Sequence, residues 1–145
     1  MTAAREPAPL RVELPAVPGS VPGARGAAVA FARDAGASES VVANIALAVS
    51  EACTNVVLHA YRDRADAGTL TLEAARHETL LEIVVIDAGG GLEPRTDSPG
   101  LGMGLALMAA VTTSLQLDHD GTDTRVRLTF ELGDAGERVD DAPTS

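Results

Sequence analysis

Residues 38–59 read SESVVANIALAVSEACTNVVLH. Apolar residues recur along this stretch at steps of three or four, which is the spacing of one face of an α-helix: Val42, Ile45, Val49, Ala52 and Val56. Ser38 stands where its hydroxyl can cap the first turn. The stretch therefore predicts a long helix, from Ser38 to about His59, with one face turned to a core.

Shorter elements are predicted on both sides of this helix. The expected strands are residues 10–14, 69–75, 80–87, 114–118 and 124–132, and the expected further helices are residues 21–34 and 104–111. Ser20 is expected to cap the helix of residues 21–34, and Gly36 to end it. Residues 80–87 are almost continuously apolar, which favours a central strand. Turns are expected at residues 76–78 and at Asp120-Gly121.

The order of these elements predicts the fold class. Strands that pair through hairpins, with helices between the pairs, indicate an α/β protein: a two-layer α/β sandwich with a mixed, mainly antiparallel sheet and helices on one face. The 145 residues suit one domain, expected at residues 10–132. Residues 1–9 are expected to be a flexible N-terminal tail, and residues 133–145 an acidic, flexible C-terminal tail.

Composition excludes several functions. The formal charge of −10 opposes direct binding of nucleic acid or of an anionic membrane surface. The chain has no lysine, which excludes Schiff-base chemistry and the lysines of Walker-type and ordinary kinase phosphate sites. The few aromatic residues make base stacking an unsuitable binding mode. A protein, or a ligand that brings its own cation, is the expected partner.

Cys53 is the only cysteine, so no disulfide can form within the chain. The sequence has no apolar segment typical of a signal peptide, and its apolar stretches are interrupted by Asn44, Glu51 and Glu82. These features predict a cytoplasmic protein that does not span a membrane.

The first candidate site lies on the long helix. Asn44, Ala48, Glu51 and Asn55 share one helical stripe, so the side chains of Glu51 and Asn55 project side by side. A carboxylate can accept a proton from an attacking hydroxyl, while an amide oxygen can bind Mg²⁺. The alternative is an ordinary pair of polar residues on a solvated helix face.

Two glycine-rich segments are the other candidates. Asp87-Ala88-Gly89-Gly90-Gly91 ends the central strand, where Asp87 could accept a hydrogen bond from the amine of adenine. Residues 100–105, GLGMGL, lead into a helix and could hold phosphates with backbone N–H groups. Their spacing is not that of a dinucleotide-binding fingerprint. The alternatives are a strand end followed by a flexible loop, and a hinge or plain helix start.

Together, the three motifs resemble the N box and the two glycine boxes of the GHKL, or histidine-kinase-like, ATPase superfamily. The run from Ala48 to Asn55, followed by His59-Ala60-Tyr61, is most similar to the anti-sigma factor serine-protein kinases of partner-switching systems. The resemblance covers about residues 10–132 and implies the histidine-kinase-like ATPase fold. The chain is therefore identified as a candidate member of that family.

The resemblance implies a role for each matching residue. Glu51 would be the general base, Asn55 the ligand of Mg²⁺ between the ATP phosphates, and Asp87 the reader of the adenine amine. Residues 92–99 would form a short lid, and His59 would be packing or polar support. The remaining residues implied to contact the nucleotide are Gly89, Gly91, Gly100, Leu101, Gly102, Met103, Gly104, Leu105 and Thr122.

The function that the resemblance implies is an ATP- and Mg²⁺-dependent serine-protein kinase. It would bind a sigma factor and phosphorylate a serine on a STAS-domain antagonist, and homodimerisation is a further family expectation. One alternative is an ATP-gated regulator that binds protein partners and transfers phosphate poorly. Another, a detached domain that phosphorylates histidine on other proteins, is disfavoured by the N-box similarity and the short lid.

Overall fold

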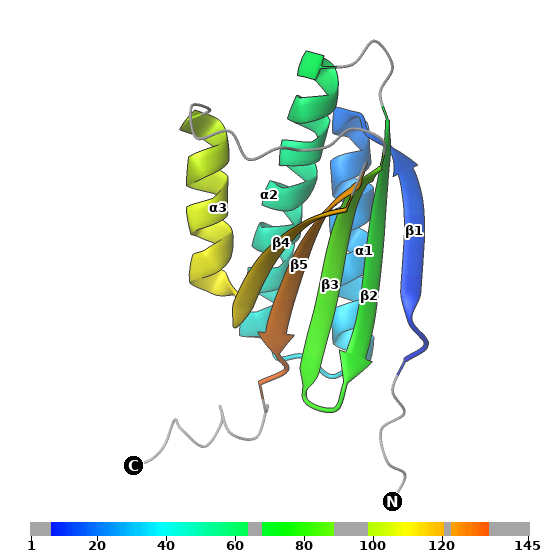
Figure 1. The fold of residues 1–145 in the computed structure, drawn as a ribbon. Coiled ribbons are helices and arrows are strands. Elements are labelled where there is room, and N and C mark those ends of the chain that lie inside the picture. Colours follow the sequence, from blue (N-terminus) through cyan, green and yellow to red (C-terminus); the bar gives the residue numbers. More distant parts are fainter. Residues whose placement is uncertain (1–6, 64–67, 89–98, 121–122, 134–145) are drawn as a thin grey trace, which may run out of the picture.

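The computed structural model describes residues 7–63, 68–88, 99–120 and 123–133. In these segments a five-stranded sheet is covered on one face by three α-helices (Figure 1). In chain order the elements are β1 (Leu10–Pro15), the 3-10 helix η1 (Pro18–Ser20), α1 (Val21–Asp34), α2 (Glu39–Asp63), β2 (Thr69–His77), β3 (Leu80–Ala88), α3 (Pro99–Val111), β4 (Ser114–Asp120) and β5 (Asp123–Glu131). The predicted two-layer α/β sandwich is confirmed.

The strand order is β1-β2-β3-β5-β4, so the nearly continuous apolar strand β3 is central, as predicted. All four pairings between the described strands are antiparallel, so the described part of the sheet is not mixed, whereas the sequence predicts a mixed sheet. The β2–β3 hairpin pairs His77 with Leu80, which places its turn at Glu78 and Thr79 and not at residues 76–78. Glu78 has a φ of 59°, because so tight a turn requires a left-handed residue.

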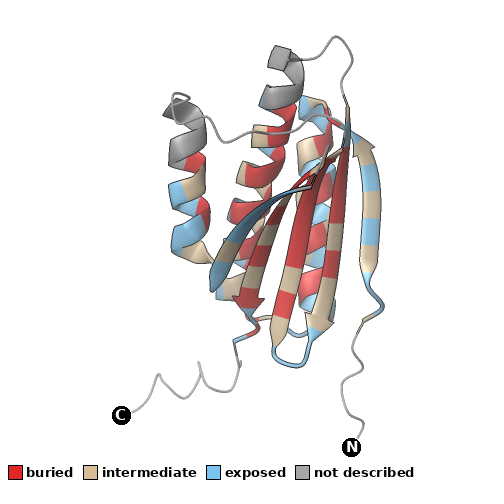
Figure 2. Ribbon diagram, in the orientation of Figure 1, coloured by how far each residue is buried: buried red, intermediate tan, exposed pale blue. Residues whose placement is uncertain are grey.

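The core lies between the sheet and the helices, and α2 supplies its largest helical share. Every member of the predicted apolar stripe of α2 is buried: Val42, Ile45, Val49, Ala52 and Val56. Facing residues on the central strands, such as Leu72, Ile83 and Leu128, are fully buried as well. Figure 2 shows the buried residues gathered along α2 and the central strands. The segment Glu39–Leu58 is long and apolar enough to cross a membrane by composition, but here its apolar stripe is buried within the domain. It is therefore a core helix.

The ends of α1 and α2 test the predicted caps. Gly36 has a φ of +93°, and Ala37 N–H donates to the carbonyl of Ala32, so Gly36 ends α1 as predicted. Ser38 Oγ accepts a hydrogen bond from the N–H of Val41 at 3.2 Å, which confirms the cap of α2. The predicted cap by Ser20 is wrong. Its backbone is already helical because η1 runs directly into α1, and its side chain makes no capping hydrogen bond.

Helix α3 begins earlier than predicted. It starts at Pro99, so residues 100–104 lie in its first turns and do not form a loop before it. Proline favours the first helical position because its missing N–H would have no partner in the helix there. The several glycines in this segment disfavour a helix in isolation, by about 1 kcal/mol each, and packing against α2 compensates for them.

Candidate functional site

Glycine 104 brings two of the predicted motifs together. It is buried in α3, and a Cβ atom built on it would lie 3.1 Å from Oε1 of Glu51 and 3.1 Å from Nδ2 of Asn55. The missing side chain at position 104 thus leaves space for both polar groups of α2. The predicted second glycine box therefore contacts the predicted N box directly.

Glu51 and Asn55 are half-buried and lie one turn apart on α2. Neither side chain is hydrogen-bonded or ion-paired with any other residue in the described segments. A carboxylate and an amide in this state are available to a ligand. Their chemistry suits a proton acceptor beside an oxygen ligand for a hard divalent cation.

Asp87 lies at the end of β3 with only 1% of its surface exposed. It shares the helix-facing side of the sheet with Leu81, Ile83 and Val85. Its carboxylate has an interaction partner, while Oδ2 accepts no hydrogen bond from the described residues. A carboxylate buried this deeply is stable only when it is well hydrogen-bonded, so an N–H donor such as an adenine amine fits this position.

Thr124 is a candidate that the sequence reasoning missed. It pairs with Asp87 across β3 and β5, and it is 4% exposed. Its Oγ1 lies 3.0 Å from Nδ1 of His119 on β4. The period-two alternation of β5 was the available signal, because it places Thr124 on the same face as Val126 and Leu128. The sequence resemblance predicts Thr122 instead, which lies outside the described residues.

The remaining predicted site residues lie partly outside the described segments and partly within α2 and α3. Gly89, Gly91 and residues 92–98 of the expected lid lie outside the described residues. Leu105 is partly buried and packs against the core, and Ala48 is fully buried. The backbone of Gly100, Leu101, Gly102 and Met103 is helical. In the described segments no group of three His, Cys, Asp or Glu residues could hold a metal ion, so the structure offers no metal site there built from these residue types alone.

Cys53 lies on the same helix as Glu51 but takes no part in such a site. Its side chain is fully buried, and burial raises the pKa of its thiol to about 12. The thiol therefore stays protonated and unreactive at neutral pH.

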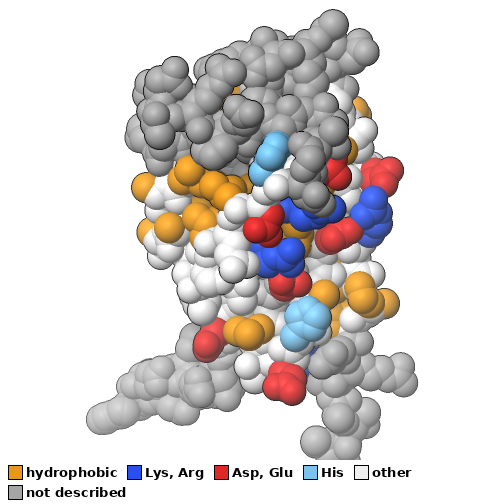
Figure 3. Space-filling view, in the orientation of Figure 1, with side chains coloured by type: hydrophobic (Ala, Val, Ile, Leu, Met, Phe, Trp, Pro, Cys, Tyr) orange, Lys and Arg blue, Asp and Glu red, His pale blue; other side chains and the backbone are white. Residues whose placement is uncertain are grey.

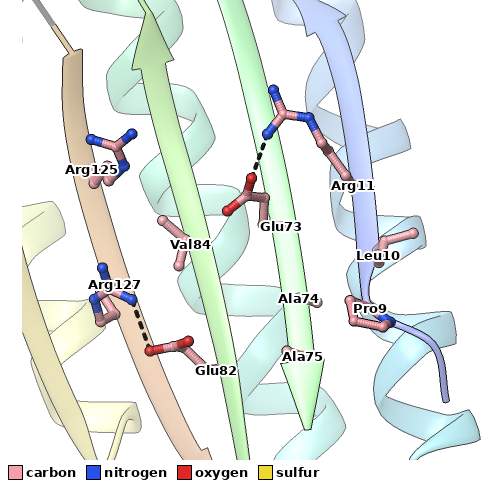
Figure 4. Close-up of a pocket in the computed structure, with 10 residues that line it drawn as sticks. All are labelled: Pro9, Leu10, Arg11, Glu73, Ala74, Ala75, Glu82, Val84, Arg125 and Arg127. Atoms are coloured by element: carbon pink, nitrogen blue, oxygen red, sulfur yellow. Dashed lines mark hydrogen bonds and ion pairs between the residues drawn. The ribbon is translucent and has the colours of Figure 1, made fainter.

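A separate hollow of about 380 Å³ lies on the open face of the sheet (Figure 4). Charged side chains gather on this face (Figure 3). Two ion pairs cross the hollow, Arg11 with Glu73 and Arg127 with Glu82, the latter at 2.9 Å. The hydrogen bond to Glu82 also raises the pKa of Arg127. This hollow lies on the side of the sheet away from the helices, and none of the predicted site residues lines it.

An apolar hollow of about 340 Å³ lies between the start of α1 and the outer face of α2. Its lining residues are Pro18, Val21, Pro22, Thr54, Val57 and Leu58. Neither Glu51 nor Asn55 lines this hollow.

Comparisons with known proteins show the family to which the chain belongs. Residues 14–130 match the family model of the histidine kinase-like ATPase domain. The chain is 32% identical over 122 residues to an anti-sigma F factor of Caldanaerobacter subterraneus, covering 76% of this chain and 84% of that protein. It is 32% identical over 94 residues to the serine-protein kinase RsbW of Bacillus cereus, covering 54% of this chain and 58% of that one.

A solved structure shows the same fold. The crystal structure of the RsbU and RsbW domains of a Mycobacterium tuberculosis protein matches with a TM-score of 0.69 and 26% identity, covering 87% of this chain and 33% of that one. The chain therefore belongs to the histidine kinase-like ATPase domain family, in the group that contains the anti-sigma F factors and the RsbW serine-protein kinases.

Proposed function

We propose that this protein is an ATP- and Mg²⁺-dependent serine-protein kinase that binds a sigma factor and phosphorylates a serine on a STAS-domain antagonist. The observation that carries the proposal is the contact of Gly104 with Glu51 and Asn55. It joins the groups suited to metal binding and proton transfer to the glycine-rich start of α3. The names of the relatives, anti-sigma F factor and serine-protein kinase, support a role as a kinase that regulates a sigma factor. A cytoplasmic location is part of the proposal.

In the proposed reaction each residue has one task. Asn55 would hold Mg²⁺ through its amide oxygen. Asp87 would orient the adenine ring by accepting a hydrogen bond from its exocyclic amine. Mg·ATP supplies the γ-phosphoryl group that is transferred. Glu51 takes the proton from the serine hydroxyl as the serine oxygen bonds to phosphorus and the bond to the ADP oxygen breaks.

Phosphate charge needs no lysine in this proposal. The metal ion would balance it together with the backbone N–H groups of residues 100–102, which have no partner within α3 because the helix begins at Pro99. Gly89, Gly91 and Thr122 remain predicted contacts of the same nucleotide. Homodimerisation also remains a prediction.

Capture of partners from the native lysate tests the proposal. The tagged protein is incubated with lysate and Mg·ATP, and bound proteins and acid-stable phosphoserine are identified by mass spectrometry. We expect a sigma factor, and a STAS protein phosphorylated by the wild type but not by Glu51→Ala. Glu39→Ala, which removes an exposed carboxylate from the same helix, is the matched control and should phosphorylate normally. Partners without phosphoserine would instead indicate an ATP-gated binding regulator.

A further inference from the structure

A row of side chains crosses the helix-facing side of the sheet at the end of β3. His119 of β4 pairs with Thr124 of β5, and Thr124 pairs with Asp87 of β3. Residues directly opposite one another on antiparallel strands share a face and are close enough to interact. The row thus runs from an exposed histidine on the edge strand to an almost fully buried carboxylate.

The hydrogen bond between His119 and Thr124 has two chemically different forms. The Nδ1 to Oγ1 distance is 3.0 Å, and either atom could supply the proton. Thr124 has one hydroxyl proton and stands opposite Asp87, whose carboxylate is only an acceptor. A hydroxyl beside a carboxylate donates to it preferentially, because a bond to a charged acceptor is about twice as strong as a neutral one. Oγ1 is then left to accept from Nδ1–H.

We propose that His119 is a positioning residue of the nucleotide site, which acts through Thr124 on Asp87. By donating from Nδ1, His119 directs the Thr124 hydroxyl proton toward Asp87 and fixes which carboxylate oxygen is presented to the adenine amine. The inference rests on the proposed function, because it assumes that Asp87 reads adenine. It adds a residue on an outer strand to the determinants of base specificity.

Substitutions at position 119 can test this proposal without disturbing the core. His119 is exposed on β4, which lies at the edge of the sheet, so its replacement removes little buried surface. Asparagine carries an amide nitrogen at the place of Nδ1 and can donate the same hydrogen bond, whereas leucine cannot. Gln116, exposed on the same strand, provides the matched control Gln116→Leu.

The first measurement is nucleotide affinity by calorimetry with the full chain. We expect His119→Leu to raise the Kd for ATP by about fivefold, and His119→Asn and Gln116→Leu to leave it unchanged. For purine riboside triphosphate, which lacks the amine, His119→Leu should have no effect. Equal losses for both nucleotides, or for His119→Asn as well, would overturn the proposal, because a merely structural role would not depend on the amine.

A double-mutant cycle tests the path through Thr124. Thr124→Val alone should raise the Kd for ATP by about tenfold, and adding His119→Leu should cause no further loss. Additive losses of about fiftyfold would show that His119 acts independently of Thr124, against the proposal.

The tautomer of His119 gives a readout that needs no nucleotide. A long-range proton–nitrogen correlation spectrum of the free protein at about pH 8 should show Nδ1 protonated, and Thr124→Val should shift that signal. Protonation of Nε2 alone would reverse the donor and contradict the proposal. If wild type binds no ATP while this tautomer is found, the proposed function fails and the hydrogen-bond assignment stands.

Discussion

Gly104 of α3 lies against Glu51 of α2 so closely that a Cβ on the glycine would be 3.1 Å from the carboxylate oxygen Oε1. Few real side chains approach so near, so an added methyl group must displace the carboxylate by a few tenths of an ångström. The glycine thus lets the polar ends of Glu51 and Asn55 lie directly against α3.

Gly104→Ala should separate stability from function. Alanine favours a helix over glycine by up to about 1 kcal/mol, which offsets the strain of the tight contact, so the free energy of unfolding should change little. The displaced Glu51 and Asn55 should lower the rate of phosphorylation by at least about tenfold, because catalysis is sensitive to small shifts of the groups involved. Urea unfolding and a phosphorylation assay measure the two effects.

A matched glycine provides the control. Gly26 lies within α1, and nothing is within 4 Å of a Cβ built on it. Gly26→Ala should raise the free energy of unfolding by about 0.5–1 kcal/mol and leave phosphorylation unchanged. Equal activity of Gly104→Ala and Gly26→Ala would show that the contact with Glu51 has no functional importance.

Asn55→Ala and Glu51→Ala should affect different steps. Loss of the amide at position 55 removes a metal ligand, so we expect Mg·ATP binding to be abolished or turnover to be lost. Loss of the carboxylate at position 51 should leave Mg·ATP affinity nearly unchanged and slow phosphoryl transfer by about 10²–10⁴-fold. Calorimetry and single-turnover kinetics distinguish the two. Unchanged transfer in Glu51→Ala would remove the general-base assignment.

Asp87→Asn should reduce selectivity for adenine. The substitution keeps the shape of the buried side chain but removes a charged acceptor, and such hydrogen bonds contribute about 1.5–3 kcal/mol. We expect the Kd for ATP to rise by about 10- to 100-fold, and affinity for purine riboside triphosphate to change much less. Competition binding with both nucleotides measures this difference. The same loss for both would mean that Asp87 supports the pocket without reading the base.

Cys53 should make the protein less stable in alkali. Its pKa is raised by burial to about 12 in the folded state, against an ordinary value of 9.0. The folded protein therefore holds a proton that the unfolded chain releases, and the stabilisation is full below about pH 9 and is lost as the pH rises toward about 12. Between pH 8 and pH 10.5 the free energy of unfolding should fall by about 2 kcal/mol.

Urea unfolding across this pH range measures the effect, and Cys53→Ala is the control that should remove most of the slope. The chain has no lysine and one tyrosine, so few other side chains titrate in the same interval. An unchanged slope in Cys53→Ala would assign the alkaline instability to another group.

Local patterns in the sequence predicted those parts of the fold that depend on periodicity and capping. The helical stripe of α2 is buried as expected, and Ser38 and Gly36 act as cap and stop because both are local devices. The sequence pattern predicts that α3 begins at residue 104, whereas the structure begins it at Pro99. Glycines at residues 100–104 disfavour a helix locally, and only packing against α2, which the sequence alone does not display, compensates for them.

The same division applies to the candidate site. The sequence by itself determined which residue types could do the chemistry, because a carboxylate and an amide one helical turn apart must project together from α2. Tertiary structure decided what they meet: the buried Gly104 opposite Glu51 and Asn55, and the row that joins Asp87 to Thr124 and His119. Contacts between distant elements depend on strand register and helix packing, and these are fixed only when the whole core is assembled.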